Sequence, residues 1–241
     1  MYVENHGFRA PADELASIWR YMDFTKFVSL LDRQQLFFCR ADKFEDRFEG
    51  AYPRGAHAQR DRYPPQIAEL RRFVAINCWH MNTGESAAMW RLYLKSDEGI
   101  AVKSSFARLT KAFERTQEDV LISTVDYIDY DNDQFRLERY VNALLPYLHK
   151  RDSFAHEREL RAMVVKLPKP DGSQAMELSS ATPDALAGGL GVDVDLHALI
   201  EEVVVAPGSP EWLFRLIGNV AQKYGFDFTV RRSRLEEDPR Y

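Results

Sequence analysis

The sequence predicts an α+β protein with a mixed, partly antiparallel sheet and flanking helices. Apolar runs of strand length interleave with segments of helical period, no single βαβ rhythm organises them, and the chain contains no internal repeat. A chain of 241 residues that is 45% hydrophobic and 29% charged is typical of a globular protein. We expect residues 1–14 to form a loosely held tail and residues 15–241 to form a single α+β domain.

The first half of the chain contains several strand and helix patterns. The fold is expected to begin with the aromatic strand "IWRYMD", followed by a helix for which Asp23 or Thr25 is the cap. The runs "QLFFCR" and "VAINCWHM" are typical of buried strands, and residues 64–73 look helical. Ser86 is placed to cap a helix through "ESAAMWRLYLK". The segments "GIAVKSS" and "DVLISTVDYIDY" then predict a strand and a long alternating strand.

The second half begins with a helical stripe between Asp133 and His149, which Pro146 should kink or end. The strand "ELRAMVVKL" follows, with "PKPDGS" able to close a hairpin onto "QAMEL", and residues 179–191 are expected to form a Gly-rich loop. Residues 201–231 predict a strand, a helix and a strand. Ser209 suits the N-cap of that helix, Pro210 its first position and Gly225 the position just past its end.

The charge balance bounds the class of partner. Lys and Arg number 32 against 37 Asp and Glu, and the net charge of −5 does not favour binding to a nucleic acid backbone without a local basic groove. The two cysteines, Cys39 and Cys78, lie in apolar runs, as buried free thiols do, so we expect a cytoplasmic protein without disulfides. No apolar run approaches the roughly 18 residues that a membrane span needs.

Two segments could carry a site, and each has a purely structural alternative. In "DKFEDRFEG", Asp42, Glu45, Asp46 and Glu49 could hold a divalent cation, but the same residues suit a turn with local ion pairs. The spacing matches no calcium-loop pattern, and we predict no metal ligand. In "CWHMNTGESAAMW", two tryptophans flank a helix start that could hold an anion and a flat ligand, or both rings could belong to the core.

A third segment, "HERELRAMVV", places charges before a buried strand. If the strand begins near Glu159, then Glu157, Glu159 and Arg161 point to one face. These charges either pair with cations such as Arg20, Arg158 or Lys150, or they line a cleft. The pattern alone leaves both alternatives open. Familiar signatures for nucleotide-binding loops, α/β-hydrolases and zinc proteases are absent from the chain.

Three blocks taken in order resemble the bacterial domain of unknown function 2971 (DUF2971) family. They are "WRYMDFTKFVSLLDRQQLFFCRADKFEDRFEG", "INCWHMNTGESAAMWRLYLKSDEGIAVKSSF" and "KRDSFAHERELRAMV", and they span residues 18–166. The family pattern includes an acidic loop, an "M-W-x-x-Y" helix and an "E-x-E-x-R" strand. Arg47 stands where the family often has proline, which leaves the conformation of the acidic loop open. The resemblance brings no agreed activity.

A more distant resemblance bears on chemistry. A basic residue on an N-terminal strand, followed much later by a Glu-x-Glu strand, is similar to the organisation of ADP-ribosyltransferases, which use NAD as co-substrate. This resemblance implies that Glu159 is the essential carboxylate and that Glu157 orients the acceptor. It also implies that NAD is bound by four aromatic or basic residues, with Arg20 on the pyrophosphate and Trp90 or Tyr93 stacked on a base: Arg20, Tyr21, Trp90 and Tyr93.

Three functions therefore remain open. The chain is expected to be a bacterial protein that consumes NAD, as an ADP-ribosyltransferase-like enzyme or an NAD glycohydrolase with a small nucleotide ligand. The first alternative is a metal-dependent nuclease or hydrolase in phage defence that uses residues 42–49. The second is a non-catalytic ligand-binding module in which both acidic groups are structural. The three hypotheses differ in whether Arg20, Trp90 and Glu159 share one concave site.

Overall fold

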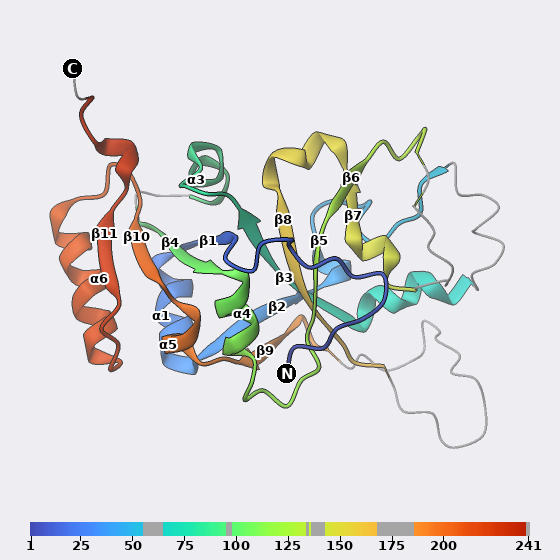
Figure 1. Ribbon diagram of the computed structural model, residues 1–241, viewed down its shortest axis with the longest axis horizontal. Helices are drawn as coiled ribbons and strands as arrows, with labels where there is room; N and C mark the ends of the chain where they lie inside the picture. Colours follow the sequence, from blue (N-terminus) through green and yellow to red (C-terminus); the bar gives the residue numbers. More distant parts are fainter. Residues whose placement is uncertain (55–64, 95–97, 134, 136–142, 168–185, 240–241) are drawn as a thin grey trace.

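The computed structural model describes residues 1–54, 65–94, 98–133, 135, 143–167 and 186–239 (Figure 1). Over this part of the chain, helices flank a mixed and mostly antiparallel sheet, which confirms the predicted α+β class. The strands are β1 (Ser17–Asp23), β2 (Gln35–Arg40), β3 (Val74–Met81), β4 (Gly99–Ser105), β5 (Leu121–Thr124), β6 (Asp126–Ile128), β7 (His149–Arg151), β8 (Glu159–Val165), β9 (Gly189–Asp193), β10 (Glu202–Val205) and β11 (Thr229–Arg232). The α-helices are α1 (Phe24–Arg33), α3 (Ala87–Tyr93), α4 (Phe106–Ala112), α5 (Leu196–Leu199) and α6 (Glu211–Lys223). Short 3-10 helices are η1 (Ala41–Lys43), η3 (Pro65–Arg72), η4 (Leu145–Leu148), η5 (Asp152–Glu157) and η6 (Arg234–Glu236).

The main sheet forks at β3. The described strands run in the order β11-β10-β4-β1-β3-β2-β9, while β8 and β5 continue from β3. One edge of β3 pairs with β8 along its whole length, from Val74 to His80. The other edge is shared, because β1 pairs only at Trp19↔His80 and Ile18↔Met81 and β2 pairs only at the opposite end of β3. Between these two contacts, residues 77–79 of β3 face a gap between β1 and β2.

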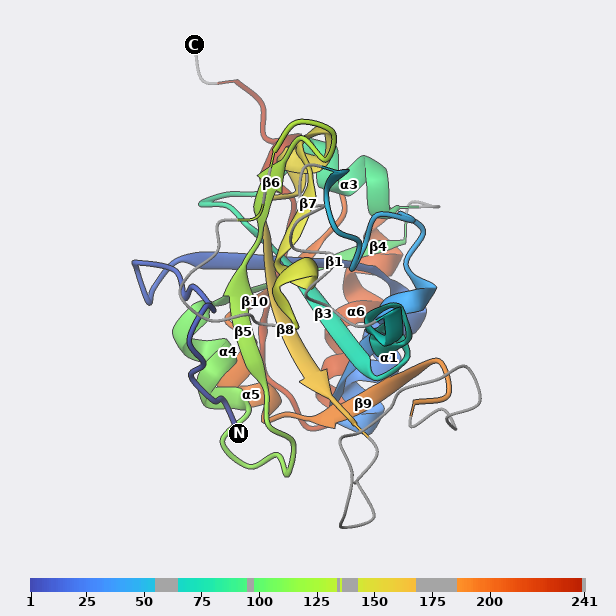
Figure 2. The same ribbon diagram turned by 90° about the vertical axis from the view of Figure 1, so that its right-hand side faces the viewer.

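The two faces of the sheet are covered differently (Figures 1 and 2). Helices α1, α4, α5 and α6 pack on one face and form the largest hydrophobic core with apolar side chains of β1, β4, β8 and β10. On the other face, α3 packs on β1 and β4, and η3 and η4 cover β3 and β8 in two smaller cores. The fork therefore opens between the α3 cluster and the η3–η4 cluster, on a face that helices cover only in part.

Local sequence signals set several boundaries as predicted. The side chain of Asp23 accepts a hydrogen bond from the backbone N–H of Lys26 and so caps α1, and Ser86 caps α3 in the same way through Met89. Gly225 has a φ of +84°, as expected for the residue that follows a helix. Helix α6 begins one residue later than predicted, because Pro210 takes the N-cap position in place of Ser209.

Other expectations differ from the structure. The long strand predicted around residues 120–130 is two short strands, β5 and β6, which join different sheets. The predicted Gly-rich loop contains β9, since Gly189 and Gly191 lie in register with β2. Residues 1–9 are held along β5 by backbone hydrogen bonds and are not loose. The hairpin predicted over residues 168–178 and the first part of the helical stripe predicted after Asp133 lie outside the described residues. The last part of that stripe is the 3-10 helix η4, which contains Pro146.

Candidate active site

A cavity of about 1260 Å³ lies at the fork of the sheet. The cavity is lined by residues of β1, β2 and β3 around the gap, of α1 and α3, of the loop 44–49, and of the segment from Lys150 to Glu159. Of the residues named from sequence, Arg20, Tyr21, Tyr93, Glu157 and Glu159 line this cavity. A basic residue near the start of the chain and the Glu-x-Glu pair thus share one concave site, whereas Trp90, the third residue expected there, does not line it.

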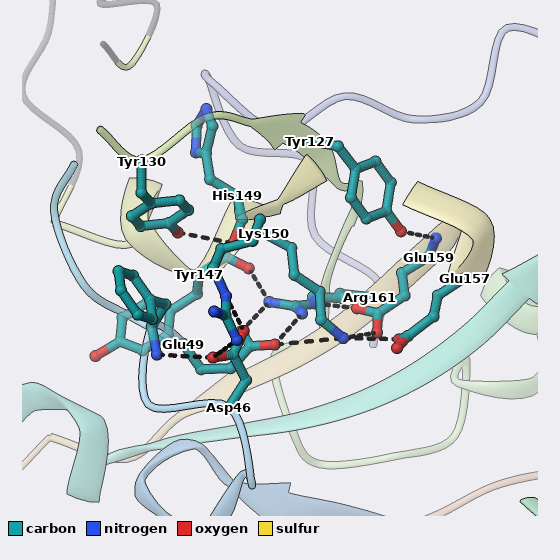
Figure 3. A network of polar contacts seen from close by, with 12 residues as sticks. Asp46, Glu49, Tyr127, Tyr130, Tyr147, His149, Lys150, Glu157, Glu159 and Arg161 are labelled. Carbon is teal, nitrogen blue, oxygen red and sulfur yellow. Dashed lines mark hydrogen bonds and ion pairs between the residues drawn. The ribbon is translucent and has the colours of Figure 1, made fainter. Parts of the chain in front are cut away.

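The acidic pair belongs to a buried ionic cluster (Figure 3). Arg161, with 0% of its side chain exposed, donates from Nε to Glu159 at 2.6 Å and from both terminal nitrogens to Glu49 at 2.8 and 2.7 Å. Lys150 Nζ lies 2.7 Å from Glu157, 3.0 Å from Glu159 and 3.7 Å from Glu49. Glu159 is therefore both a cavity residue and a partner of two cations. The sequence left open whether this carboxylate pairs with cations or lines a cleft, and in the structure it does both.

The location of Glu157 refines the sequence prediction. Strand β8 begins at Glu159, and Glu157 ends η5, with Arg158 between them in the left-handed conformation at φ 42°. The two carboxylates still meet, because Lys150 lies between them and binds both. Lys150 is thus the partner of the acidic pair, while Arg158 donates instead to the side chain of Asn82.

The cluster holds three carboxylates, Glu49, Glu157 and Glu159, against two cations, Lys150 and Arg161. One carboxylate is in excess, and burial makes that excess costly. Burial, together with the hydrogen bond and charge of Glu159, raises the pKa of Glu157 to about 7. Burial would also raise the pKa of Glu159, but Arg161, Glu157 and Lys150 outweigh it and hold that pKa well below the ordinary range. The excess proton therefore binds to Glu157, while Glu159 stays ionised.

Arg20 lies at the gap in the sheet. Its Nη1 donates to the backbone carbonyl of Cys78 at 2.6 Å, on the edge of β3 opposite β8, where among the described residues neither β1 nor β2 pairs with it. Within the same part of the chain, no carboxylate lies within salt-bridge distance of Arg20. Burial lowers the pKa of Arg20, and the nearby groups that act on it are Cys78, Tyr93 and Cys39. A guanidinium with unused donors and no acidic partner is suited to an anionic ligand.

The aromatic residues predicted to bind NAD divide into core and cavity positions. Trp90 is 2% exposed, stacks edge-on against Tyr21 and donates to Glu85, and it does not line the cavity. The stacking role proposed for Trp90 is therefore wrong for this conformation, because α3 packs that ring onto β1. Tyr21 borders the cavity, with its hydroxyl occupied by the backbone N–H of Ser86. Tyr93 is 46% exposed at the cavity, where a flat group can reach its ring.

Three of the four carboxylates in the acidic loop at residues 42–49 pair with basic side chains, and Glu45 is exposed. Asp42 pairs with Arg40, Asp46 with Arg151 at 2.8 Å, and Glu49 with Arg161. Among the described residues, no group of three or more potential ligands is arranged to hold a metal ion. Asp46 and Glu49 do border the same cavity as Glu159, but their oxygens already accept hydrogen bonds from guanidinium groups.

Sequence reasoning did not single out His80 or Phe37, both of which line the cavity. His80 lies opposite Glu159 across the β3–β8 pair, and its Nδ1 is 2.6 Å from the carbonyl of Glu157. A carbonyl only accepts, so Nδ1 carries the proton and Nε2 is left as an acceptor. This Nε2 is buried and has no hydrogen-bond partner among the described residues. The imidazole in "CWHMN" and the first Phe of "LFFCR" gave no periodic signal that would mark them as functional.

Comparison with known proteins gives structural similarities only. No family model matches the chain, including that of the DUF2971 family, and no curated protein matches its sequence. The solved structure of Thermus sp. 2.9 DarT in complex with ADP-ribosylated ssDNA is similar over 92% of this chain and 96% of that chain, at 13% identity and a TM-score of 0.44. DarT in complex with carba-NAD+ gives 12% identity and a TM-score of 0.43, and DarT in complex with NAD+ gives 10% and 0.42, each over 92% of this chain and 97% of that chain.

These similarities extend along most of both chains at low identity. Within the described part of the chain, none of the helices is both long and apolar enough to cross a bilayer.

Proposed function

We propose that the cavity binds NAD and that the protein cleaves the bond between nicotinamide and ribose, as an ADP-ribosyltransferase-like enzyme or an NAD glycohydrolase. The observation that carries the proposal is the shared cavity. It has on one side a cation, Arg20, with no acidic partner in the described part of the chain, and on the other an ionised carboxylate, Glu159. A dinucleotide requires both features, since its diphosphate is anionic and its reacting carbon becomes cationic.

The electrostatics of the carboxylates suit this bond cleavage. When the C1′–N bond breaks, its electron pair moves to the nicotinamide nitrogen and neutralises the pyridinium, and positive charge develops on the ribose. A carboxylate that is already ionised stabilises this charge without first losing a proton. Glu159 meets that requirement, because Arg161 and Lys150 keep it ionised and fixed in position.

Glu157 is assigned the proton transfer. The acceptor, which is water in a glycohydrolase, forms the new bond to C1′ and must lose one proton. A group with a pKa near the working pH is the most effective general base. The pKa of Glu157 is raised to about 7, and Glu157 lines the cavity beside Glu159. Arg20 would hold the diphosphate. Tyr93 would contact the nicotinamide end, since the charges of Glu157 and Glu159 are among those that raise the pKa of its hydroxyl.

The first experiment measures nicotinamide release from NAD by the full chain and by Glu159→Gln and Arg20→Gln. We expect Glu159→Gln to lower kcat by at least about 100-fold. Arg20→Gln should raise KM by about tenfold or more, because one charge-assisted contact to the diphosphate is lost. Arg20 makes one described hydrogen bond, so this variant is expected to fold. Arg215→Gln, on the exposed face of α6, is the matched control and should leave both constants unchanged.

If the wild-type chain releases no nicotinamide and NAD does not raise its melting temperature, the cavity does not serve this reaction. If Glu159→Gln retains wild-type kcat with an intact circular dichroism spectrum, the reaction does not use this carboxylate. The acidic cluster would then be structural, as in the ligand-binding alternative.

A further inference from the structure

Phe37 has a large apolar side chain that is exposed to solvent. It lies on β2, where its neighbours Leu36 and Phe38 are buried in the main core, whereas 57% of Phe37 is exposed. Strand alternation explains the difference, since Phe37 points to the opposite face of the sheet, and there its side chain borders the cavity. Within the described part of the chain, no other aromatic ring or cation stacks on it. One hydrophobic side chain on a surface is ordinary, but an unstacked ring on a cavity wall is available to a ligand.

The backbone around Phe37 positions its ring. Strand β9 pairs with β2, with Gly191 opposite Phe37 and Gly189 two residues further along. A Cβ atom built on Gly189 would lie 2.4 Å from Cζ and 2.7 Å from Cε2 of Phe37, so the ring occupies the space that only glycine leaves open. On the other side of β2, Asn77 Nδ2 donates to the carbonyl of Phe37 at 2.8 Å. The ring is therefore placed before any ligand binds.

Phe37 lies at the far end of the cavity from the acidic pair. The β3–β8 register places Glu159 beside His80, whereas Phe37 lies on β2 two residues past the last described β2–β3 pair, Cys39↔Ile76, at the border of the gap. Two strand spacings of about 4.8 Å and two residues of about 3.3 Å give a separation of at least roughly 12 Å between the Cα atoms of Glu159 and Phe37. Arg20 lies between these ends, since it donates to the carbonyl of Cys78.

The order carboxylate, guanidinium, aromatic ring matches the parts of a dinucleotide. We propose that Phe37 stacks on the adenine base of NAD and so selects a dinucleotide over a mononucleotide, an inference that rests on the function proposed above. The ribose that reacts lies at Glu159, the diphosphate lies at Arg20 and the adenine reaches Phe37. Of the other exposed aromatic residues that line the cavity, Phe48 already stacks on Tyr130 and beneath Arg151. Tyr93 lies on α3, across the cavity from β2, where it is available to the other half of the ligand.

The experiment compares two nucleotides that differ in the adenine half. Binding of NAD is measured by calorimetry, and nicotinamide mononucleotide is measured as its competitor, for the wild-type chain, Phe37→Leu and Phe37→Trp. We expect Phe37→Leu to weaken NAD binding about tenfold and to leave the mononucleotide within about twofold, because stacking on one base is the interaction removed. Phe37→Trp should bind NAD about as tightly as the wild type, because the indole ring can also stack on the base.

Trp212→Leu is the matched control, because Trp212 is an equally exposed aromatic residue, at 58%, that does not line the cavity. Unchanged NAD binding in Phe37→Leu, or equal weakening of both nucleotides, overturns the inference while nicotinamide release by the wild type still stands. A change in oligomeric state in place of NAD affinity shows that Phe37 contacts a second copy, and it also overturns the inference. A wild-type chain that neither binds nor cleaves NAD overturns the proposed function together with it.

Discussion

Replacing Glu157 by glutamine is expected to stabilise the protein at high pH, even though it removes a carboxylate from the proposed active site. The ionic cluster has three carboxylates and two cations, so ionisation of Glu157 leaves one buried negative charge without a partner. Glutamine has nearly the shape of a protonated glutamate and carries no charge. In Glu157→Gln, Glu49 and Glu159 are balanced by Lys150 and Arg161.

The size and sign of the effect follow from the pKa of Glu157, which rises from its ordinary 4.5 to about 7 in the folded protein. Between these two values the folded state binds more protons than the unfolded state, so the free energy of unfolding falls as the pH rises through this window. A gap of about 2.5 pKa units, at 1.36 kcal/mol each, sets an upper limit of about 3 kcal/mol. At pH 5 Glu157 is protonated in the folded wild type, so wild type and Glu157→Gln should differ least there.

Urea unfolding of both proteins at pH 5, 6, 7 and 8 measures this difference. We expect Glu157→Gln to gain about 1–3 kcal/mol relative to the wild type between pH 5 and pH 8. Glu114→Gln, which alters an exposed carboxylate, should follow the wild type at every pH. If the difference between Glu157→Gln and the wild type does not grow with pH, the proton is held elsewhere in the cluster. The role of Glu157 as general base would then lose its support.

Two further predictions concern groups around the acidic pair. Arg161→Met should lower the free energy of unfolding by about 3–5 kcal/mol in urea at pH 7, because it leaves Glu49 and Glu159 buried with Lys150 as their one remaining cation; a loss below about 1 kcal/mol would show that the cluster is not structural. His80→Asn keeps a donor near the Glu157 carbonyl but removes the Nε2 acceptor, whereas His80→Gln does the reverse. If Nε2 accepts a hydrogen bond from substrate, kcat/KM for NAD should fall about tenfold in the Asn variant and less in the Gln variant, and the opposite order would indicate that His80 acts by holding the Glu157 backbone.

The sequence predicted the elements whose signals are local. Strand β1, the caps of α1 and α3 and the alternation on β8 depend on neighbouring residues, so one stretch of chain was enough to identify them. On β8, Glu159 and Arg161 share a face with Met163, which packs in the core beneath η3 and η4, as the alternation required. The residues of the Gly-rich segment 189–191 were missed as a strand because glycine disfavours strands in general and is required here by the ring of Phe37.

The site itself depends on contacts that no local pattern encodes. Arg161 and its partner Glu49 are 112 residues apart in sequence, and the gap that Arg20 enters exists only because β1 and β2 share one edge of β3. Trp90 shows the reverse error, since an aromatic residue next to a helix start satisfies a ligand-stacking pattern and a core pattern equally well. Periodicity reports which side of an element is apolar, but it does not report whether a helix or a ligand covers that side.

The charge imbalance of the cluster connects its structural and chemical roles. A cluster needed only for stability would gain from equal numbers of opposite charges, and Glu49, Glu159, Lys150 and Arg161 already provide that balance. Glu157 adds a third carboxylate at the cavity side of the cluster. There burial and the neighbouring Glu159 raise the pKa of Glu157 to about 7, and its ionisation destabilises the fold. A residue that lowers stability in this way and lines a cavity is best explained by the proton it carries. For this reason a gain in stability and a loss of nicotinamide release in the same variant, Glu157→Gln, would together be the strongest support for the proposed reaction.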